Sequence, residues 1–238
     1  SAGDVRIVKF LIIRPQPGAD ATAHRLRAAG YAACLMPLFV IEHLPVQRVL
    51  TEGYDAILLT SGNAVRAAAD YLTGDHNLSV YAVGSATASA LHKLSVPVAK
   101  TGSEGVEALL RVAGADGHKR LLWLAGEDYT AIPQLNGVSI DIEIVYRSAA
   151  VSTPDDFASK VTQSDLVILH SSRAATHFAG LCDALELHRG AITLATFSTA
   201  IALSAGVGWA SMIVADTPND AALFDAIKRH FEMAHCAS

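Results

Sequence analysis

Two segments of the sequence repeat the same order of residue types 110 residues apart. DAILLTSGNAV starts at Asp55, and DLVILHSSRAA starts at Asp165. Each has an acidic residue, four apolar residues without alternation, a small polar cluster and then apolar residues at helical spacing. An unalternated apolar run is typical of a strand buried on both faces, and small polar residues after it are typical of a helix N-cap. Both segments therefore predict a strand, a turn and a helix.

The repeat extends to other parts of the chain. KFLII at Lys9 and KRLLW at Lys119 are again 110 residues apart, and YAVGSATASAL at Tyr81 aligns with LATFSTAIAL at Leu194 at an offset of 112, which pairs Thr87 with Thr199. We interpret the chain as a duplicated α/β module. Alternating strands and helices predict parallel sheets covered by helices, and a duplication in 238 residues favours two domains.

Two features refine this pattern. TPDDF at Thr153 and TPNDA at Thr217 each predict a helix with threonine as N-cap and proline in the first helical position. The stretches CLMPLFVIEHLPVQ from Cys34 and SIDIEIVYRSAAVS from Ser139 are extended and occupy equivalent places in the two copies, so that Tyr146 corresponds to Met36. We interpret these stretches as paired connectors between the two lobes.

Composition limits the possible partners. The net charge of −5 argues against nucleic acid, because binding to a phosphate backbone depends on a basic surface. No apolar run approaches the roughly 18 residues that a membrane helix needs, so we expect no membrane partner. Cys34, Cys182 and Cys236 are widely spaced and odd in number, which favours free thiols in a reducing cytoplasm over disulfides or a metal site.

Small polar residues gather where the predicted buried strands end and helices begin. In α/β sheets ligands bind at that carboxyl edge, and the free N–H groups of a helix's first turn attract anions. Taken singly, each of these residues is better explained as a helix cap. Taken together, they predict a cleft for an anionic ligand. The residues are Thr60, Ser61, Gly62, Asn63, Gly84, Ser85, Thr87, Ser171, Ser172, Arg173, Ser198 and Thr199.

Familiar catalytic motifs are missing from the sequence. It contains no GxSxG, no GxxxxGK[ST] and no GxGxxG that opens a helix, and its ten histidines form neither HxH nor HExxH. Of these, only His170, at a predicted strand end, would lie near the cleft, and a structural role is the better interpretation for it. Tyr146, on a connector, would project between the lobes, where a phenol can donate a proton; a structural, half-buried tyrosine is an equally good interpretation.

Several motifs, in order along nearly the whole chain, resemble the uroporphyrinogen-III synthase family. They are LIIRPQPGA from Leu11, LMPLFVI from Leu35, ILLTSGNAV from Ile57, YAVGSATASAL from Tyr81, VYRSAA from Val145 and VILHSSRA from Val167. The resemblance implies an α/β fold of two flavodoxin-like domains, each a parallel sheet flanked by helices. The first domain would comprise residues 1–38 and 149–238, the second residues 45–143, and residues 39–44 and 144–148 would form a two-stranded β connector. The two copies of the sequence repeat would then not coincide with the two domains, because each domain would contain parts of both copies.

The resemblance also implies an activity. It is the dehydration and cyclisation of the linear tetrapyrrole hydroxymethylbilane to uroporphyrinogen III, with inversion of ring D and without a cofactor or metal. Tyr146 matches the tyrosine that assists departure of the hydroxyl group, and Arg14 matches an arginine before proline near the N-terminus. The polar cluster residues would bind the substrate's carboxylates. The resemblance further implies a cytoplasmic enzyme of heme biosynthesis, and we expect a monomer.

Two other classes of protein remain open at this point. A non-catalytic two-lobed protein that closes on a small anion, such as a sensor domain, would share the fold, but it would have no use for Tyr146 as a proton donor facing the cleft. A Rossmann-type nucleotide enzyme is disfavoured because the glycine fingerprint is missing.

Overall fold

The structure, a computed structural model, describes residues 7–47, 53–103, 105–129, 131 and 137–236. It divides the chain into two compact units. Unit 1 consists of residues 1–40 and 150–238, and unit 2 of residues 41–149. The expected domain ranges also include residues 1–6, 48–52, 104, 130, 132–136 and 237–238, which lie outside the described residues.

Unit 1 is built on a parallel five-stranded sheet in the order β11-β10-β9-β1-β2. Its strands are β1 (Lys9–Ile12), β2 (Ala32–Leu35), β9 (Leu166–Leu169), β10 (Thr193–Thr196) and β11 (Ser211–Val214). Its helices are α1 (Gly18–Ala28), α6 (Phe157–Thr162), α7 (Ser172–Ala184), the 3-10 helix η1 (Arg189–Ala191), α8 (Thr199–Ala205) and α9 (Asp220–Cys236).

A six-stranded sheet in the order β3-β8-β7-β4-β5-β6 forms the centre of unit 2. Its strands are β3 (Phe39–His43), β4 (Ala56–Leu59), β5 (Ser79–Val83), β6 (Lys100–Gly102), β7 (Arg120–Gly126) and β8 (Ser139–Ala150). Neighbours from β8 to β6 are parallel. Its helices are α2 (Gly62–Ala67), α3 (Ala69–Leu72), α4 (Ser85–Lys93) and α5 (Val106–Ala115).

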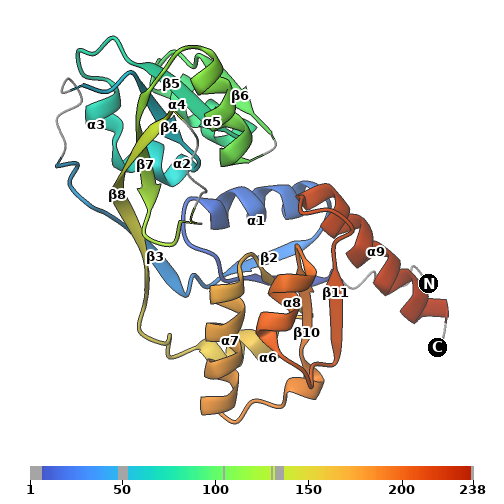
Figure 1. Ribbon diagram of the computed structural model, residues 1–238. Helices are drawn as coiled ribbons and strands as arrows, with labels where there is room; N and C mark the ends of the chain where they lie inside the picture. Colours follow the sequence, from blue (N-terminus) through green and yellow to red (C-terminus); the bar gives the residue numbers. More distant parts are fainter. Residues whose placement is uncertain (1–6, 48–52, 104, 130, 132–136, 237–238) are drawn as a thin grey trace. The chain divides into compact units, whose positions relative to one another are not determined.

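Each sheet has helices on both faces, as Figure 1 shows. In unit 1, α6, α7 and α8 cover the face that carries Leu11 and Val167, while α1 and α9 cover the face that carries Phe10 and Ile168. In unit 2, α2, α3 and α4 pack on the face of Ile57, and α5 packs on the other face. Strands β4 and β9 are fully buried. The prediction of parallel sheets flanked by helices is therefore confirmed.

The repeat in the sequence is matched by a repeat in strand order. The order β2-β1-β9-β10-β11 corresponds, strand for strand, to β8-β7-β4-β5-β6. Strands β1 and β7 are equivalent, as are β4 and β9, yet β1 pairs with β9 and β7 pairs with β4. Each sheet is therefore assembled from both sequence copies, with the first two strands of each copy exchanged (β1 and β2 for β7 and β8).

The alignment of β5 with β10 needs a correction. Helix α4 begins at Ser85 after the N-cap Gly84, and α8 begins at Thr199 after the N-cap Ser198. The equivalent caps are therefore 114 residues apart (198 − 84), two more than the offset of 112 predicted from sequence. The 3-10 helix η1 lies in the connection before β10, where such extra residues can be accommodated.

The two extended stretches differ in detail from the prediction. The stretch from Cys34 is interrupted, because β2 ends at Leu35 and β3 begins at Phe39. Between them lies Pro37, which has no N–H to donate to a strand ladder. The second stretch is one strand, β8, which is hydrogen-bonded to β3. Leu44 donates its N–H to the Val145 carbonyl, at 2.8 Å, so the two stretches pair as strands, while their role as connectors between lobes stays a prediction.

Two predicted helix starts are wrong. Helix α6 begins at Phe157 rather than beside Thr153, and the residues before it form a turn in which Phe157 N–H bonds the Pro154 carbonyl at 3.0 Å. Helix α9 begins at Asp220, and Asn219 rather than Thr217 accepts the N–H of Ala222, at 2.9 Å. The asparagine competes with the threonine because it too is a strong N-cap residue.

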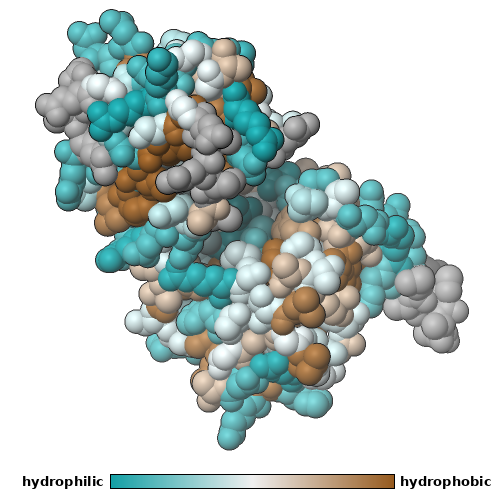
Figure 2. Space-filling view, viewed as in Figure 1, coloured by the Kyte–Doolittle hydropathy of each residue, from teal (hydrophilic) through white to brown (hydrophobic). Residues whose placement is uncertain are grey.

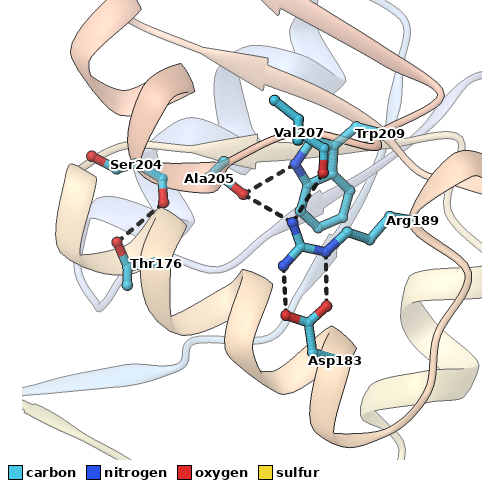
Figure 3. A network of polar contacts seen from close by, with 7 residues as sticks. All are labelled: Thr176, Asp183, Arg189, Ser204, Ala205, Val207 and Trp209. Atoms are coloured by element: carbon cyan, nitrogen blue, oxygen red, sulfur yellow. Dashed lines mark hydrogen bonds and ion pairs between the residues drawn. The ribbon is translucent and has the colours of Figure 1, made fainter.

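Arg189 joins the end of α7 to the loop between α8 and β11 (Figure 3). Its guanidinium binds both carboxylate oxygens of Asp183, at 2.8 and 2.6 Å, and donates to the carbonyls of Ala205 and Val207, at 3.4 and 3.1 Å. It also lies 4.6 Å from the centre of the Trp209 ring. One planar cation with five donors can satisfy a carboxylate, the last carbonyl of α8 and a carbonyl of the following loop together. We therefore assign Arg189 a structural role in unit 1.

Apolar residues at the surface of unit 1 occur in small separate areas on the face shown in Figure 2. The exposed apolar side chains include Leu203 and Val207, which are 76% and 87% exposed. Isolated apolar residues of this kind are normal on a protein surface. Among the helices that the structure describes, none is long and apolar enough to cross a membrane.

Candidate functional site

The direction of Tyr146 is set by a break in the register of β8. Ala125 pairs with Ile144, but the next residue of β7, Gly126, pairs with Tyr146, so Val145 is an extra residue in β8. Regular alternation would place Tyr146 on the face of Ile144, which packs against α5. Because of the extra residue, Tyr146 instead packs on the opposite face, together with Val145. The phenol therefore lies on the face covered by α2 and α4.

The ring of Tyr146 lies directly on Gly126, at the carboxyl end of β7. A Cβ atom added at Gly126 would stand 2.4 Å from the ring carbon Cζ and 2.6 Å from the phenol oxygen. The phenol donates a hydrogen bond to Ser61 Oγ, at 3.2 Å. The phenol can therefore take this position only because residue 126 is glycine, since a side chain there would occupy the same space.

Ser61 connects the phenol to the first turn of α2. Its Oγ accepts the N–H of Asn63, at 3.1 Å, as an N-cap. The side chain of Asn63 in turn accepts a hydrogen bond from Arg66. Ser61, Asn63 and Tyr146, all predicted as site residues, therefore lie together. A serine oxygen that accepts two hydrogen bonds still has its own O–H to donate to a ligand.

The other predicted residues of unit 2 differ in accessibility. Thr60 Oγ1 accepts from Trp123 Nε1, at 3.3 Å, and its own O–H remains to donate. Gly84 is the N-cap of α4 with φ of 81°, a conformation that favours glycine, and Ser85 is exposed. Thr87 is only 3% exposed. Its hydroxyl is therefore poorly placed to meet a ligand from solvent.

Unit 1 has a corresponding polar edge. Ser171 and Ser198 are N-caps whose hydroxyl oxygens accept the N–H groups of Ala174 and Ile201, at 3.2 and 3.4 Å. Both residues follow adjacent parallel strands, β9 and β10, so they lie at the same edge. The remaining predicted residues of this edge, Ser172, Arg173 and Thr199, are exposed. The interpretation of the serines as helix caps is thus correct, and their O–H groups remain possible donors.

Arg14 follows β1 at this same edge. Its guanidinium packs over Gly18, where an added Cβ would be 2.5 Å from Nε, and it lies 3.4 Å from Thr22 Oγ1. Burial lowers the pKa of Arg14, and the charge of Asp220 opposes this shift. Arg14 therefore places a partly buried positive charge beside the carboxyl ends of β1 and β9.

His170, one residue before the cap Ser171, is a buried imidazole. Its ring lies 4.9 Å from that of Phe197, and among the described residues neither ring nitrogen has a hydrogen-bond partner. Burial first, and then the charges of Arg14 and Arg25, lower its pKa to about 3, although the nearby backbone of Ile168 favours the protonated ring slightly. His170 is therefore neutral at physiological pH.

We expect His170 to make the protein less stable in acid. In the unfolded chain it gains a proton near pH 6.5, whereas in the folded chain it does so only near pH 3. Between these values the unfolded state binds the extra proton, so His170 lowers the free energy of unfolding by about 1.4 kcal/mol per pH unit as pH falls. His170→Phe should flatten the fall in urea-derived stability between about pH 6.5 and 4.5, whereas His24→Gln, at an exposed position, should not. Parallel curves for wild type and His170→Phe would refute this assignment.

Two hollows in unit 2 lie away from these residues. One, of about 520 Å³, is formed around the amino ends of β5 and β6, and the other, of about 340 Å³, around the amino ends of β7 and β8. Tyr146 and Ser61 lie at the carboxyl ends, where ligands of parallel sheets bind. Within the described ranges, no three His, Cys, Asp or Glu side chains are grouped so that they could hold a metal ion.

Sequence reasoning missed two residues of the Tyr146 site. Gly126 carries no signal in the sequence, because the need for a residue without a side chain there depends on the register shift in β8. Arg66 stands three residues after Asn63, which is the spacing at which helical side chains meet, so a signal for it was present.

These features together define a class of protein: an α/β protein with parallel sheets flanked by helices and polar residues at the carboxyl edges. The family profile described as uroporphyrinogen-III synthase HemD matches residues 20–225. The chain therefore belongs to the uroporphyrinogen-III synthase family. Membership makes it a cyclising lyase of heme biosynthesis. The alternative of a non-catalytic sensor or anion-binding protein is not favoured.

Solved structures share the fold at low sequence identity. The uroporphyrinogen-III synthetase of Helicobacter pylori has a TM-score of 0.62 and 18% identity, over 94% of this chain and 99% of that chain. A mutant uroporphyrinogen III synthase of Thermus thermophilus has a TM-score of 0.53 and 17% identity, over 95% and 99% of the two chains. No curated protein matched the chain.

Proposed function

We propose that the chain converts hydroxymethylbilane to uroporphyrinogen III at the carboxyl edges of its two sheets, with Tyr146 as the proton donor. The single observation that carries this assignment is the placement of the Tyr146 phenol over Gly126 and beside Ser61. The phenol is half-buried and lies at the end of the sheet where ligands of parallel sheets bind.

The proposed reaction needs one proton at its start and releases one at its end. The phenol gives its proton to the hydroxyl oxygen of the substrate, the C–O bond breaks, and water leaves with the bonding electron pair. The pyrrole nitrogen stabilises the resulting cation as an azafulvene-type electrophile, and ring D closes on it through a spiro intermediate that inverts the ring. The proton released when the last pyrrole regains aromaticity restores the phenol. Atoms therefore balance as substrate to product plus one water.

Binding accounts for the outcome of the closure. Because the substrate can lose water and close unaided to the wrong isomer, the enzyme must hold it in a folded conformation. We propose that its carboxylates bind the O–H groups and free backbone N–H groups of the polar edges, together with Arg14. The residues are Arg14, Thr60, Ser61, Gly62, Asn63, Gly84, Ser85, Ser171, Ser172, Arg173, Ser198 and Thr199. Thr87 was predicted to bind the substrate with these residues, but it is buried, so we do not include it in the proposed binding site.

We further propose that the two compact units act as domains. In this proposal residues 1–38 and 149–238 form one domain, residues 45–143 the other, and residues 39–44 and 144–148 the connector. The pairing of β3 with β8 supports the connector. A monomer in the cytoplasm is the simplest setting for this activity.

The function is tested by product analysis. Freshly prepared hydroxymethylbilane is incubated with increasing amounts of the protein, and the uroporphyrinogen isomers are separated after oxidation to porphyrins. We expect the type III isomer to increase with protein concentration at the expense of type I. Formation of type I alone at every protein concentration would rule out the proposed function.

A further inference from the structure

We infer that Arg66 acts through Tyr146: its guanidinium stabilises the phenolate that forms when Tyr146 gives its proton to the substrate. This inference rests on the proposed function of Tyr146. Arg66 is therefore a positioning and electrostatic residue, because it acts on the phenol rather than on the reacting carbon.

A short series of contacts connects the two side chains. Tyr146 Oη bonds Ser61 Oγ, at 3.2 Å, and the same Oγ accepts the N–H of Asn63. The side-chain oxygen of Asn63 accepts a hydrogen bond from Arg66 Nη2. The guanidinium also lies over Gly62, where an added Cβ would be 3.3 Å from Nη1. Arg66 is thereby held against the first turn of α2, the turn that contacts the phenol.

The charge of Arg66 is not neutralised by an ion pair. Within the described part of the chain its hydrogen-bond acceptor is the neutral amide of Asn63, and no carboxylate forms a salt bridge with it. Arg111 and Arg120, in the same unit, are instead paired with Glu107 and Asp141. A guanidinium without a carboxylate partner keeps an uncompensated positive charge that can act on a nearby group, although solvent screens part of the field of an exposed side chain.

The guanidinium is partly desolvated, although the Arg66 residue as a whole is exposed. Removal from solvent lowers the pKa of Arg66, and its interaction with Tyr146 opposes that shift. Two further charged residues lie beside Tyr146: Arg147, its neighbour in sequence, is paired with Glu42 at 2.6 Å, and the backbone N–H of Glu127 bonds the Tyr146 carbonyl at 3.0 Å. Among the residues that the structure describes, Arg66 is thus a cation without a carboxylate partner that is placed to respond when the phenol loses its proton.

The hydroxyl of Ser61 complements this role. In the resting state the phenol donates to Ser61 Oγ, which leaves the serine hydrogen free. When the phenol hydrogen turns to the substrate's hydroxyl oxygen, the serine O–H can rotate and donate to the phenol oxygen. The phenolate would then be stabilised by one O–H group and one cation, both fixed to α2 before the reaction begins.

The test compares Arg66→Gln, which removes the charge but keeps an amide donor, with Arg66→Lys, which keeps the charge. We expect Arg66→Gln to lower kcat for type III formation about tenfold with little change in KM, and to move the alkaline limb of kcat to higher pH. Arg66→Lys should retain the alkaline limb. Arg111→Gln, a helical arginine of the same unit, is the matched control and should leave both values unchanged.

A spectroscopic titration provides a readout apart from turnover. The tyrosinate absorbance of Tyr146 is obtained as the difference between a protein and its Tyr146→Phe variant, once in the wild-type background and once in the Arg66→Gln background. We expect the Tyr146 titration to move to higher pH when Arg66 is replaced. An unmoved titration and alkaline limb, or a raised KM with unchanged kcat, would overturn the inference. If the wild-type protein forms no type III isomer, it is the proposed function that fails instead.

Discussion

Tyr146→Phe is expected to lower kcat for type III formation about a hundredfold while the fold stays intact. The substitution removes only the phenol oxygen, which donates one hydrogen bond to Ser61 at 3.2 Å. Loss of a positioned general acid costs on the order of 10²- to 10⁴-fold. We place the effect at the lower end because the substrate loses water without help. The measurement is steady-state kinetics with separation of the isomers, supported by urea denaturation.

Tyr81→Phe is the matched control for that variant. Tyr81 belongs to the same sheet, and its phenol donates to Asp116, at 2.7 Å. Burial, and then this contact with Asp116, raise its pKa to about 12, so the group stays protonated. We expect Tyr81→Phe to cost about 1 kcal/mol of stability and to leave kcat unchanged. Unchanged turnover in Tyr146→Phe would show that holding the substrate is sufficient for the reaction.

Gly126→Ala is expected to reduce kcat nearly as much as Tyr146→Phe. The backbone of Gly126 is not in the left-handed region, so alanine fits the strand, but its Cβ would stand 2.4 Å from the Tyr146 ring. The ring must therefore move, and the phenol loses its place beside Ser61. We would measure kcat for Gly126→Ala, for Tyr146→Phe and for the double variant. The double variant should lose no more kcat than Tyr146→Phe alone, because both changes remove the phenol from its position.

Gly180→Ala is the control for Gly126→Ala. An added Cβ at Gly180, in α7, meets no atom within 4 Å. This variant should keep full activity, and its stability should be equal or higher, since alanine is the better helix former. Wild-type kcat in Gly126→Ala would mean that the phenol has no role at its position over β7.

Much of the fold could be predicted because burial leaves a clear mark on the sequence. In β4, Ile57 and Leu59 face one helical layer while Ala56 and Leu58 face the other, so all four residues had to be apolar. The caps Ser61, Ser171 and Ser198 were also predictable, since each lies just after a buried strand. These features depend on neighbours in sequence or on the presence of a covering layer.

The direction of Tyr146 could not be predicted in the same way. Alternation in IDIEIVYR assigns Tyr146 to the face of Ile144, and only the pairing of Gly126 with Tyr146 reverses that assignment. The register of a strand is decided by its partner, which is distant in the sequence. The isolation of His170 is similar, because its surroundings include Arg14, Arg25 and Phe197, which are far from it in the sequence. Such features depend on tertiary pairing.

The exchange of β1 and β7 between the sheets imposes an order of assembly during synthesis. Unit 2 is one continuous segment, so it can fold as soon as it leaves the ribosome. Strand β1 emerges first, yet Phe10 pairs with Leu166, 156 residues later (166 − 10). The N-terminal segment must therefore keep its strand edge available while the whole middle of the protein is made. The nascent chain can therefore complete unit 2 before unit 1, although unit 1 begins earlier in the sequence.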